Sequence, residues 1–414
     1  MIKAVRGTRD ILPPSSAVWN HVEAVTREVF RSFHYHEIRT PIFEETALFA
    51  RGVGEETDIV SKEMYTWDDR DGSSITLRPE NTASVIRAYI EHRLDQIPGL
   101  TKLCYIGPMF RRERPQKGRY RQFSQIGAEC IGTEAPAVDA EVIELAMEIL
   151  TRCGAQNPTL LLNSVGCKKC RPVFVEALRE RLQAVKSTMC TDCQRRADTN
   201  PLRVLDCKVP EDQPIIDSLP SILDYLDPEC LAHFETVKSL LTARELKYEI
   251  RPRLVRGLDY YMRTTFEVTH GALGAQNSIL GGGRYDGLAE SLGSKVPAPG
   301  IGFSIGEDRL VMAIEEQTSA EDLAKLDVFL VPMGDAAVKH AALLARDLRR
   351  AGNVVEVSTD HKLKRAMETA NKLKARYALI LGDNEITAGV YALKNMATGE
   401  QQNLTREQLP SALL

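Results

Sequence analysis

The chain has 414 residues, of which 43% are hydrophobic and 27% are charged, and its formal net charge is -4. These values are ordinary for a soluble globular protein of two or three domains, and they show no overall positive charge for nucleic-acid binding, although a local basic surface can still bind RNA. No apolar run approaches the roughly 20 residues that span a bilayer, and the N-terminus lacks the apolar segment of a secretory signal. We therefore expect a cytoplasmic protein without a membrane partner, whose nine cysteines are thiols or metal ligands rather than disulfides.

The N-terminal region predicts a helix and then an edge strand. Apolar residues recur at helical spacing between Val18 and Phe33, after a serine pair that can cap a helix. Alternating apolar residues within Tyr35–Phe49 predict a strand that contains Pro41. Because proline cannot donate a hydrogen bond to a neighbouring strand, we expect this strand at a sheet edge or an interface.

Residues 75–92 predict a strand, a proline turn and a helix. Glu80, Asn81 and Thr82 stand where the helix begins. Polar side chains at this place lie next to the free N–H groups of the first turn. A helix cap is the plain structural interpretation of these three residues.

The most distinctive stretch runs from Cys104 to Cys130 and predicts two antiparallel strands joined by a long basic loop. The loop sets six basic residues against the single acid Glu113: Arg111, Arg112, Arg114, Lys117, Arg119 and Arg121. Guanidinium groups at a strand end can bind phosphate through paired hydrogen bonds, and an arginine-rich loop can follow a nucleic-acid backbone. Gln125 and Glu129 are four residues apart, so they point to the same side of the second strand and can hold a small polar ligand. A solvated charged loop is the alternative.

Residues 167–247 form a Lys-, Arg- and Glu-rich block with helical patterning, which we interpret as an insertion. It contains two Cys-x-x-Cys pairs: Cys167, Cys170, Cys190 and Cys193. Their spacing fits one tetrahedral zinc site, which would stabilise a module with little core of its own. Four reduced thiols without a metal are the alternative, and Cys207 is either a bystander or an alternative ligand.

Residues 251–268 predict a strand that is interrupted in the run LVRGLDYY, where Arg256 precedes Tyr260 and Tyr261. This run places a cation and two phenols beside a glycine, where a ligand can approach the backbone. An aromatic core strand is the alternative for the tyrosine pair alone.

Two glycine-containing runs follow. GGGRYDGL at residues 281–288 predicts a glycine-rich turn between a strand and a helix, and it includes Tyr285. A single glycine-rich turn is weak evidence for phosphate binding. PGIGFSIGEDRL at residues 299–310 predicts a closely packed strand and helix, and it includes Arg309.

Residues 318–326 are polar and charged and predict a linker. From Asp327 onward, predicted strands and helices alternate, which indicates a small α/β domain with a mostly parallel sheet.

These runs resemble one family. FRRE at residues 110–113 resembles motif 2 of the class II aminoacyl-tRNA synthetases, and the longer RRERPQKGRYRQFSQIGAE looks like the histidyl-tRNA synthetase version. The segment around Pro41 is similar to motif 1, which builds the family's dimer, and the run ending at Arg309 resembles motif 3. LVRGLDYY looks like the signature that separates histidyl-tRNA synthetases from other class II enzymes. The chain departs from the family pattern at Asn81, where glycine is usual, and at Asp308, where glutamate is usual.

The resemblance implies an α+β class II catalytic domain, with an antiparallel sheet flanked by helices, over residues 1–317. The helical insertion at 167–247 lies within it, and the tail at 327–414 looks like the family's α/β anticodon-binding domain. The implied activity is that of a histidine–tRNA ligase, which makes histidyl-adenylate from L-histidine and ATP with Mg²⁺ and transfers histidine to the 3′ end of tRNA(His). The implied assembly is a homodimer.

The resemblance and the residue types together assign roles. Catalysis falls to Arg111, Arg256 and Arg309. Histidine binding falls to Glu80, Asn81, Thr82, Arg111, Gln125, Glu129, Arg256, Tyr260, Tyr261 and Tyr285. ATP binding falls to Arg111, Glu113, Arg119 and Arg309. Contact with the tRNA acceptor stem falls to Arg114, Gln116, Lys117 and Arg121. The metal site falls to Cys167, Cys170, Cys190 and Cys193.

The main alternative function is a histidine-sensing regulatory paralogue of ATP phosphoribosyltransferase. Such paralogues usually lack the C-terminal domain and lose the arginine motifs, whereas this chain has both. A pure tRNA-binding module, the third option, does not explain the residues of the histidine pocket.

Overall fold

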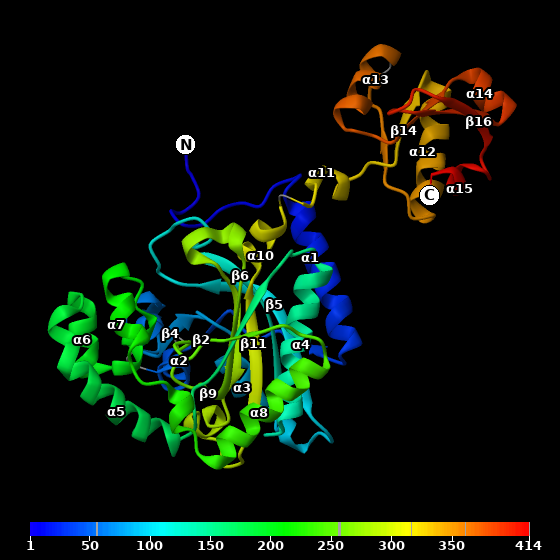
Figure 1. Ribbon diagram of the computed structural model, residues 1–414. Helices are drawn as coiled ribbons and strands as arrows, with labels where there is room; N and C mark the ends of the chain where they lie inside the picture. Colours follow the sequence, from blue (N-terminus) through cyan, green and yellow to red (C-terminus); the bar gives the residue numbers. More distant parts are fainter. Residues whose placement is uncertain (55–56, 256–257, 316, 361, 414) are drawn as a thin grey trace. The chain divides into compact units, whose positions relative to one another are not determined.

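The computed structural model describes residues 1–414 except 55–56, 256–257, 316, 361 and 414 (Figure 1). The chain divides into two compact units. The first consists of Met1–Leu12 and Val18–Thr318, and the second of Pro13–Ala17 and Ser319–Leu414.

The first unit is built on an eight-stranded sheet with the strand order β1-β5-β6-β11-β10-β9-β7-β8. The strands are β1 (His36–Glu37), β5 (Thr101–Phe110), β6 (Gln122–Ile131), β7 (Thr159–Ser164), β8 (Glu249–Ile250), β9 (Met262–Thr269), β10 (Ser278–Arg284) and β11 (Gly300–Gly306). The six central strands run antiparallel, while β1 and β8 pair in parallel with β5 and β7 at the two edges. The predicted antiparallel sheet is confirmed for these six strands.

Helices pack on this sheet. The longer ones are α1 (Ser16–Ser32), α3 (Thr82–Glu91), α4 (Pro136–Arg152) and α8 (Pro228–Ala243), and the shorter ones are α9 (Leu288–Ser291) and α10 (Glu307–Ile314), with the turns η2 (Leu94–Gln96) and η7 (Gly271–Gln276). The predicted apolar stripe of α1 is buried, and α1 and α4 lie along the same side of the sheet in Figure 1. Residues of α3 and α9 share a core with Tyr105 and Met109 of β5 and with Tyr285. These helices place the start of α3 beside the central strands.

The single strand predicted within Tyr35–Phe49 is wrong. The chain leaves the large sheet after β1 and enters a three-stranded sheet of the order β2-β4-β3. Its strands are β2 (Phe43–Glu45), β3 (Tyr65–Asp68) and β4 (Ser74–Leu77), with α2 (Thr46–Val53) and the π-helical turn η1 (Ile59–Glu63) between β2 and β3. Pro41 stands between β1 and β2, where its missing N–H ends the strand pairing.

The helical character predicted for the insertion is confirmed. It contains α5 (Cys170–Val185), α6 (Thr191–Thr199) and α7 (Gln213–Asp217), with the 3₁₀ turns η3 (Lys186–Thr188), η4 (Pro201–Asp206), η5 (Pro210–Asp212) and η6 (Ile222–Tyr225). Its buried core is small and includes Phe174, Leu178 and Leu182 of α5. Much of the block is 3₁₀ turn and loop, so a small core must hold many short elements in place.

The second unit is a five-stranded sheet with the order β13-β12-β14-β15-β16. The strands are β12 (Val328–Pro332), β13 (Val355–Val357), β14 (Tyr377–Leu381), β15 (Val390–Asn395) and β16 (Gln401–Thr405), and the helices are α11 (Ala320–Leu323), α12 (Asp335–Arg350), α13 (Leu363–Lys372), α14 (Asp383–Ala388) and α15 (Leu409–Ala412). Residues of α12 pack against Val328 and Leu330, and residues of α13 pack against Phe329 and Val331, so the two helices cover opposite faces of β12.

The sheet of this second unit is less parallel than predicted. β12 pairs in parallel with β13 and β14, whereas β14, β15 and β16 form an antiparallel run. The physical reason is the short turn between β15 and β16 and the short helix α14 before β15, because neither is long enough for a crossover that returns the chain in parallel. Across the described residues, no helix is both long and apolar enough to span a bilayer.

Candidate active site

A polar cavity of about 220 Å³ opens in the first unit beside the central strands. Its lining residues come from the start of α3, the loop between β5 and β6, strands β6, β10 and β11, and the start of α10. Those that the sequence predicted as site residues are Glu80, Thr82, Arg111, Glu113, Arg119, Gln125, Tyr260, Tyr261 and Arg309. Segments that lie far apart in sequence therefore meet around one cavity.

Three arginines on this cavity surround a single acid. Arg119 forms an ion pair with Glu113 at 3.2 Å, and Arg111 stands 4.0 Å from the same carboxylate. Burial lowers the pKa of Arg309, and the positive charges of Arg119 and Arg111 lower it further. Positive charge exceeds negative charge among these four groups, so this part of the cavity favours a bound anion such as a phosphate. The other acids of the lining, Glu80 and Asp308, already accept hydrogen bonds from backbone N–H groups and from Arg9.

The two predicted catalytic arginines that the structure describes are held by backbone carbonyls. Arg111 donates from Nε to the carbonyl of Pro79 at 2.9 Å, and its guanidinium lies 5.2 Å from the ring centroid of Phe123. Arg309 donates from Nη1 to the carbonyl of Ser278 at 2.7 Å. Neutral partners fix each guanidinium without cancelling its charge, so both remain cationic toward the cavity.

A buried carboxyl lies at the centre of the predicted histidine pocket. Glu129 on β6 is fully buried, and burial raises its pKa to about 8. Its oxygens accept hydrogen bonds from Thr82 Oγ1 at 2.7 Å, from the hydroxyl of Tyr285 at 2.7 Å and from the hydroxyl of Tyr105 at 3.4 Å. These hydroxyls hold the carboxyl in one orientation beneath the cavity.

Two glycines make room for this cluster. A Cβ on Gly302 would lie 1.8 Å from Glu129 Oε2, and Gly302 pairs with Glu129 across β11 and β6. A Cβ on Gly127 would lie 2.3 Å from the ring of Tyr105, which is its partner across β5 and β6. No side chain larger than hydrogen fits at either place without moving the carboxyl or the ring.

The amide of Gln125 is the second polar group on this face. Gln125 lines the cavity and is largely buried, and its Oε1 has no hydrogen-bond partner among the described residues. A buried acceptor without a partner is costly, and a ligand that donates a hydrogen bond would remove that cost.

At the start of α3, Glu80 provides the cap. Its carboxylate accepts the backbone N–H of Thr82 at 2.7 Å and of Ala83 at 3.0 Å. Burial raises its pKa, while these two N–H groups act in the opposite direction. The helix cap predicted for this turn is confirmed, with Glu80 as the capping side chain.

Some predicted site residues lie elsewhere. Asn81 is buried with φ -120°, and its Oδ1 accepts a hydrogen bond from Thr40 at 2.6 Å, so it supports the turn from behind the cavity lining. Tyr285 is also beneath the lining, where it bonds to Glu129 and its ring lies edge-on to that of Tyr260, 6.0 Å between centroids. Arg256 lies outside the described residues.

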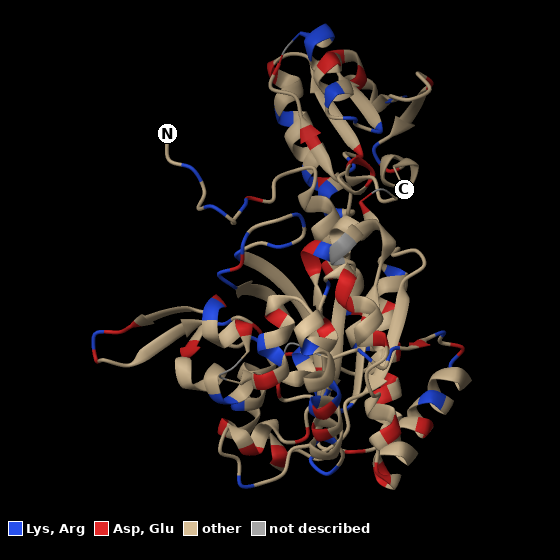
Figure 2. Cartoon of the chain, turned by 60° about the vertical axis from the view of Figure 1, so that its left-hand side comes forward, with Lys and Arg blue, Asp and Glu red and all other residues tan. Residues whose placement is uncertain are grey.

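The residues predicted to contact tRNA lie on the loop between β5 and β6. Arg114, Gln116 and Lys117 are exposed, and a backbone bridge between Gln116 and Arg119 closes the loop. Arg121 is half-buried, and its N–H donates to the carbonyl of Gly7 at 2.7 Å. Lys and Arg alternate with Asp and Glu over the molecule in Figure 2, so any RNA surface has to be local.

The predicted glycine-rich turn at 281–288 is confirmed only in its second half, because residues 281–284 belong to β10 and a turn at 285–287 leads into α9. Gly281, Gly282 and Gly283 belong to β10, and a Cβ on Gly282 would lie 2.5 Å from the carbonyl oxygen of Gly302. The glycines therefore serve close packing between neighbouring strands rather than phosphate binding. The next residue, Arg284, is fully buried and bonds to Asp139 and Asp286.

The departure at Asp308 has a visible consequence. Asp308 accepts a hydrogen bond from Arg9 at 2.8 Å and from the N–H of Ser124 at 3.0 Å. It therefore ties α10 to the N-terminal segment and to β6.

The structure does not bring the four cysteines of the two Cys-x-x-Cys pairs together. Among the described residues, Cys167 and Cys170 group with Asp227 and Cys230, while Cys190 and Cys193 group with Cys207 and Asp212. α5 begins at Cys170, is 16 residues long and ends before Cys190. Its length is about 24 Å at the helical rise of about 1.5 Å per residue. The predicted single site is therefore wrong, and Cys207 is a group member rather than a bystander.

Sequence reasoning missed several supporting residues. Tyr105, Ser304 and Phe123 contact the predicted site residues or line the cavity. Tyr105 had a detectable signal, because Gly127 interrupts the apolar alternation of β6 directly opposite it.

The comparisons agree with this geometry. The family model for histidyl-tRNA synthetase matches residues 7–310, and an anticodon binding domain model matches residues 327–414. The chain is 71% identical over 413 residues to a histidine–tRNA ligase of Solibacter usitatus (strain Ellin6076), covering 100% of this chain and 99% of that protein. It is 58% identical over 422 residues to a histidine–tRNA ligase of Koribacter versatilis (strain Ellin345), covering 99% and 95%.

Among solved structures, the chain is similar to the apo histidyl-tRNA synthetase of S. aureus, with a TM-score of 0.81, 39% identity and 100% coverage of both chains. The predicted family and fold class are confirmed, and the regulatory paralogue is not favoured. Because one family model spans most of the chain and its relatives match along nearly the whole length, the chain belongs to the histidyl-tRNA synthetases, a family of class II aminoacyl-tRNA synthetases.

Proposed function

We propose that the chain activates L-histidine with ATP to give histidyl-adenylate and pyrophosphate, and then transfers histidine to the 3′ end of tRNA(His). The observation that carries this proposal is the adjacency of an arginine-lined anion site on the cavity and a buried, hydroxyl-oriented carboxyl beneath it, joined by Thr82 of the lining. The first suits the phosphates of ATP and the second suits a polar amino-acid side chain.

In the activation step, the histidine carboxylate attacks the α-phosphate and pyrophosphate leaves. Arg111 would stabilise the negative charge that grows on the α-phosphate oxygens, because its guanidinium is already fixed by Pro79 and Phe123. Arg309 would hold the outer phosphates. Glu113 would accept a hydrogen bond from the adenine amino group while Arg119 keeps it in place. Arg256 keeps its sequence-based role at the α-phosphate and the histidine carboxylate as a proposal.

Selection of histidine would rest on paired polar contacts to the two imidazole nitrogens. Glu129 and Tyr261 are the proposed partners, with Gln125 and Glu80 toward the amino and carboxylate ends. To contact the imidazole, Glu129 must be reached by the ligand between the hydroxyls of Thr82 and Tyr285, which bond to it in the structure. A site whose buried polar groups need a donor and an acceptor rejects an analogue without them by about ten-thousand-fold or more.

Magnesium would enter as part of the substrate, bound to the outer phosphates of ATP. Among the residues that the structure describes, the groups of three or more metal-ligating side chains lie in the insertion and not on this cavity. The exposed loop residues Arg114, Gln116 and Lys117 would meet the acceptor stem in the cytoplasm, and the second unit would bind the anticodon, as its family match suggests.

A homodimer is also proposed, through the segment around β2. Phe43 and Trp67 are 57% and 42% exposed, their rings lie 6.4 Å apart, and Ile42 beside them is 44% exposed. An exposed apolar patch of this kind favours association. A Phe43→Glu variant should run as a monomer in light scattering, and an unchanged mass would remove this patch from the interface.

The test of the function is histidine-dependent exchange of labelled pyrophosphate into ATP without tRNA, followed by charging of tRNA(His). We expect exchange with histidine alone among the amino acids. A Glu129→Ala variant should lose this selectivity. Histidine binding without exchange would overturn the proposal and favour the regulatory paralogue.

A further inference from the structure

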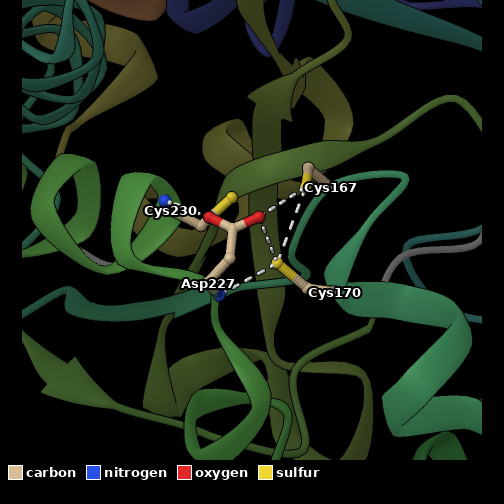
Figure 3. Close-up of side chains that lie close together, drawn as sticks. All are labelled: Cys167, Cys170, Asp227 and Cys230. Carbon is tan, nitrogen blue, oxygen red and sulfur yellow. Dashed lines mark hydrogen bonds between the residues drawn. The ribbon is translucent and has the colours of Figure 1, made fainter.

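Two compact clusters of thiols lie in the helical insertion, outside the cavity. The first tetrad consists of Cys167, Cys170, Asp227 and Cys230, which converge in Figure 3. The second tetrad consists of Cys190, Cys193, Cys207 and Asp212. In each tetrad, one ligand atom from every residue lies within 4.8 Å of the others. We propose that the insertion holds two structural divalent ions of the zinc class, one in each Cys₃Asp tetrad.

The distances in the first tetrad match a tetrahedral site. Zn–S bonds of about 2.3 Å and a Zn–O bond of about 2.1 Å place tetrahedral S···S and S···O pairs about 3.8 and 3.6 Å apart. The two sulfurs of Cys167 and Cys170 lie 3.5 Å apart, and Asp227 Oδ2 lies 3.2 and 3.3 Å from them. A disulfide needs sulfurs about 2.05 Å apart, so these are free thiols around a common centre.

The second tetrad has the same dimensions although it shares no element with the first. The sulfurs of Cys190 and Cys207 lie 3.9 Å apart, and Asp212 Oδ2 lies 3.4 Å from Cys207 Sγ. The two tetrads come from separate segments of the insertion, but each offers the same ligand atoms, three sulfurs and one carboxylate oxygen. Three thiolates with one carboxylate suit zinc, which accepts both ligand types in tetrahedral sites.

A backbone N–H orients the aspartate of each tetrad, and one carboxylate oxygen of each faces sulfur. Asp227 accepts the N–H of Cys230 at Oδ1, at 2.8 Å, and turns Oδ2 toward the sulfurs. Asp212 accepts the N–H of Cys190 at Oδ1, at 3.0 Å, and more weakly at Oδ2, at 3.3 Å, and its Oδ2 also faces Cys207. A carboxylate oriented by a backbone donor with one oxygen left for the ion is a common arrangement around metal ligands.

Backbone N–H groups also point at sulfur in both tetrads. Lys169 N lies 3.3 Å from Cys167 Sγ and Asp227 N lies 3.3 Å from Cys170 Sγ. In the second tetrad, Val209 N lies 3.4 Å from Cys207 Sγ. Such donors stabilise the thiolate, which is the form of cysteine that binds metal.

The two tetrads join elements of the insertion that are distant in sequence. Cys193 and Cys207 of the second tetrad also belong to the small core, whereas the buried core, as far as the described residues go, does not include the residues of the first tetrad. The first connects the start of α5, at the entry of the block, to the start of α8, the helix that packs against α4 and β9. The second connects the start of α6 to the loop between η4 and η5. Metal-bound ligands can replace core contacts in small modules, which is the role we assign to both ions.

The test is the zinc content of the full chain, purified without a metal-affinity tag and measured by mass spectrometry. We expect about two zinc ions per chain. Cys230→Ser and Cys207→Ser should each remove one ion, and the double variant should remove both. The matched control is Cys153→Ser, which changes a buried thiol outside both tetrads and should leave two ions.

Loss of an ion from the serine variants could also result from misfolding, so a variant that keeps both ions is needed as a control. Asp227→Cys replaces the oxygen ligand by a fourth thiolate, so the chain should still bind two ions. After exchange of zinc for Co²⁺, its sulfur-to-cobalt absorption should be stronger than that of the parent. The parent itself should saturate at two Co²⁺ per chain.

Three outcomes would overturn the proposal. In the first, the chain takes up no zinc or Co²⁺ after reduction and reconstitution. In the second, the parent chain holds one ion, and Cys230→Ser and Cys207→Ser each remove that same ion. In the third, Asp227→Cys leaves the sulfur-to-cobalt absorption unchanged. The second outcome would restore one site shared by both cysteine pairs. None of these readouts depends on aminoacylation, so failure here is distinguishable from failure of the proposed function.

Discussion

Two buried carboxyls should make the stability of the first unit fall as pH rises. Glu129 and Glu307 are both fully buried, and burial raises the pKa of each from 4.5 to about 8. The folded chain therefore keeps two protons that the unfolded chain releases above pH 4.5. Because the folded state binds more protons in this window, the stabilising contribution is fully present below pH 4.5 and is lost as pH rises through 8.

The magnitude follows from the two pKa values. Each group changes the free energy of unfolding by about 1.36 kcal/mol per pH unit between its unfolded and folded pKa. From pH 5.5 to 8.0, one group contributes about 3 kcal/mol of lost stability, and two groups contribute about 6 kcal/mol. Glu129→Gln and Glu307→Gln should each make the decline smaller by about 3 kcal/mol, because glutamine does not titrate, and the double variant should make it smaller by about 6 kcal/mol.

The assay is urea unfolding followed by tryptophan fluorescence at pH 5.5, 7.0 and 8.0. The two tryptophans, Trp19 and Trp67, both belong to the first unit, so the signal reports that unit alone. Contributions of other ionisable groups are common to all variants and cancel in the comparison. Glu290→Gln, at an exposed position, is the matched control and should keep the parental slope. If both buried variants also keep the parental slope, these carboxyls are not protonated in the folded chain.

Further predictions concern the cavity. Tyr285→Phe removes a hydroxyl that orients Glu129. In pyrophosphate exchange, this variant should raise the KM for histidine about 10- to 100-fold, which corresponds to a lost hydrogen bond of about 1.5–3 kcal/mol. The KM for ATP should not rise by a matching factor. Arg309→Lys loses one of its two carbonyl contacts, and it should raise the KM for ATP by about tenfold; an equal rise for histidine would place Arg309 outside the ATP site. Gly302→Ala drives a Cβ into the carboxyl cluster and should lower Tm by several degrees, corresponding to about 1–3 kcal/mol, whereas Gly271→Ala, which meets nothing within 4 Å, should leave Tm unchanged.

The sequence predicted the elements with strong periodicity well. The apolar stripe of α1 and the basic loop between β5 and β6 stand where the patterns placed them. Pro41 was recognised as a residue for an edge, but not as the point where the chain changes sheets. That change depends on which strands are available as partners, and sequence periodicity carries no information about partners.

The predicted site residues were of two kinds. Arg111, Gln125 and Arg309 line the cavity as expected, because each follows or lies within a strand or helix end whose direction the sequence indicates. Glu129 and Tyr285 are instead bonded to each other beneath it. Their relation depends on the pairing of β6 with β11 and on the missing side chain of Gly302, which are properties of the assembled sheet.

The cysteines show most clearly that spacing in the sequence does not predict the complete set of ligands in a site. A Cys-x-x-Cys pair specifies two ligands on one turn, but it does not specify the other two. The remaining ligands of the first tetrad, Asp227 and Cys230, are about 60 residues downstream of Cys167, and one of them is an aspartate, which no cysteine pattern includes. Arg171, next to Cys170, donates to the carbonyl of Tyr261 on the cavity. The start of α5 is therefore held on one side by the first tetrad and on the other by the pocket wall, which makes the insertion part of the support of the active site.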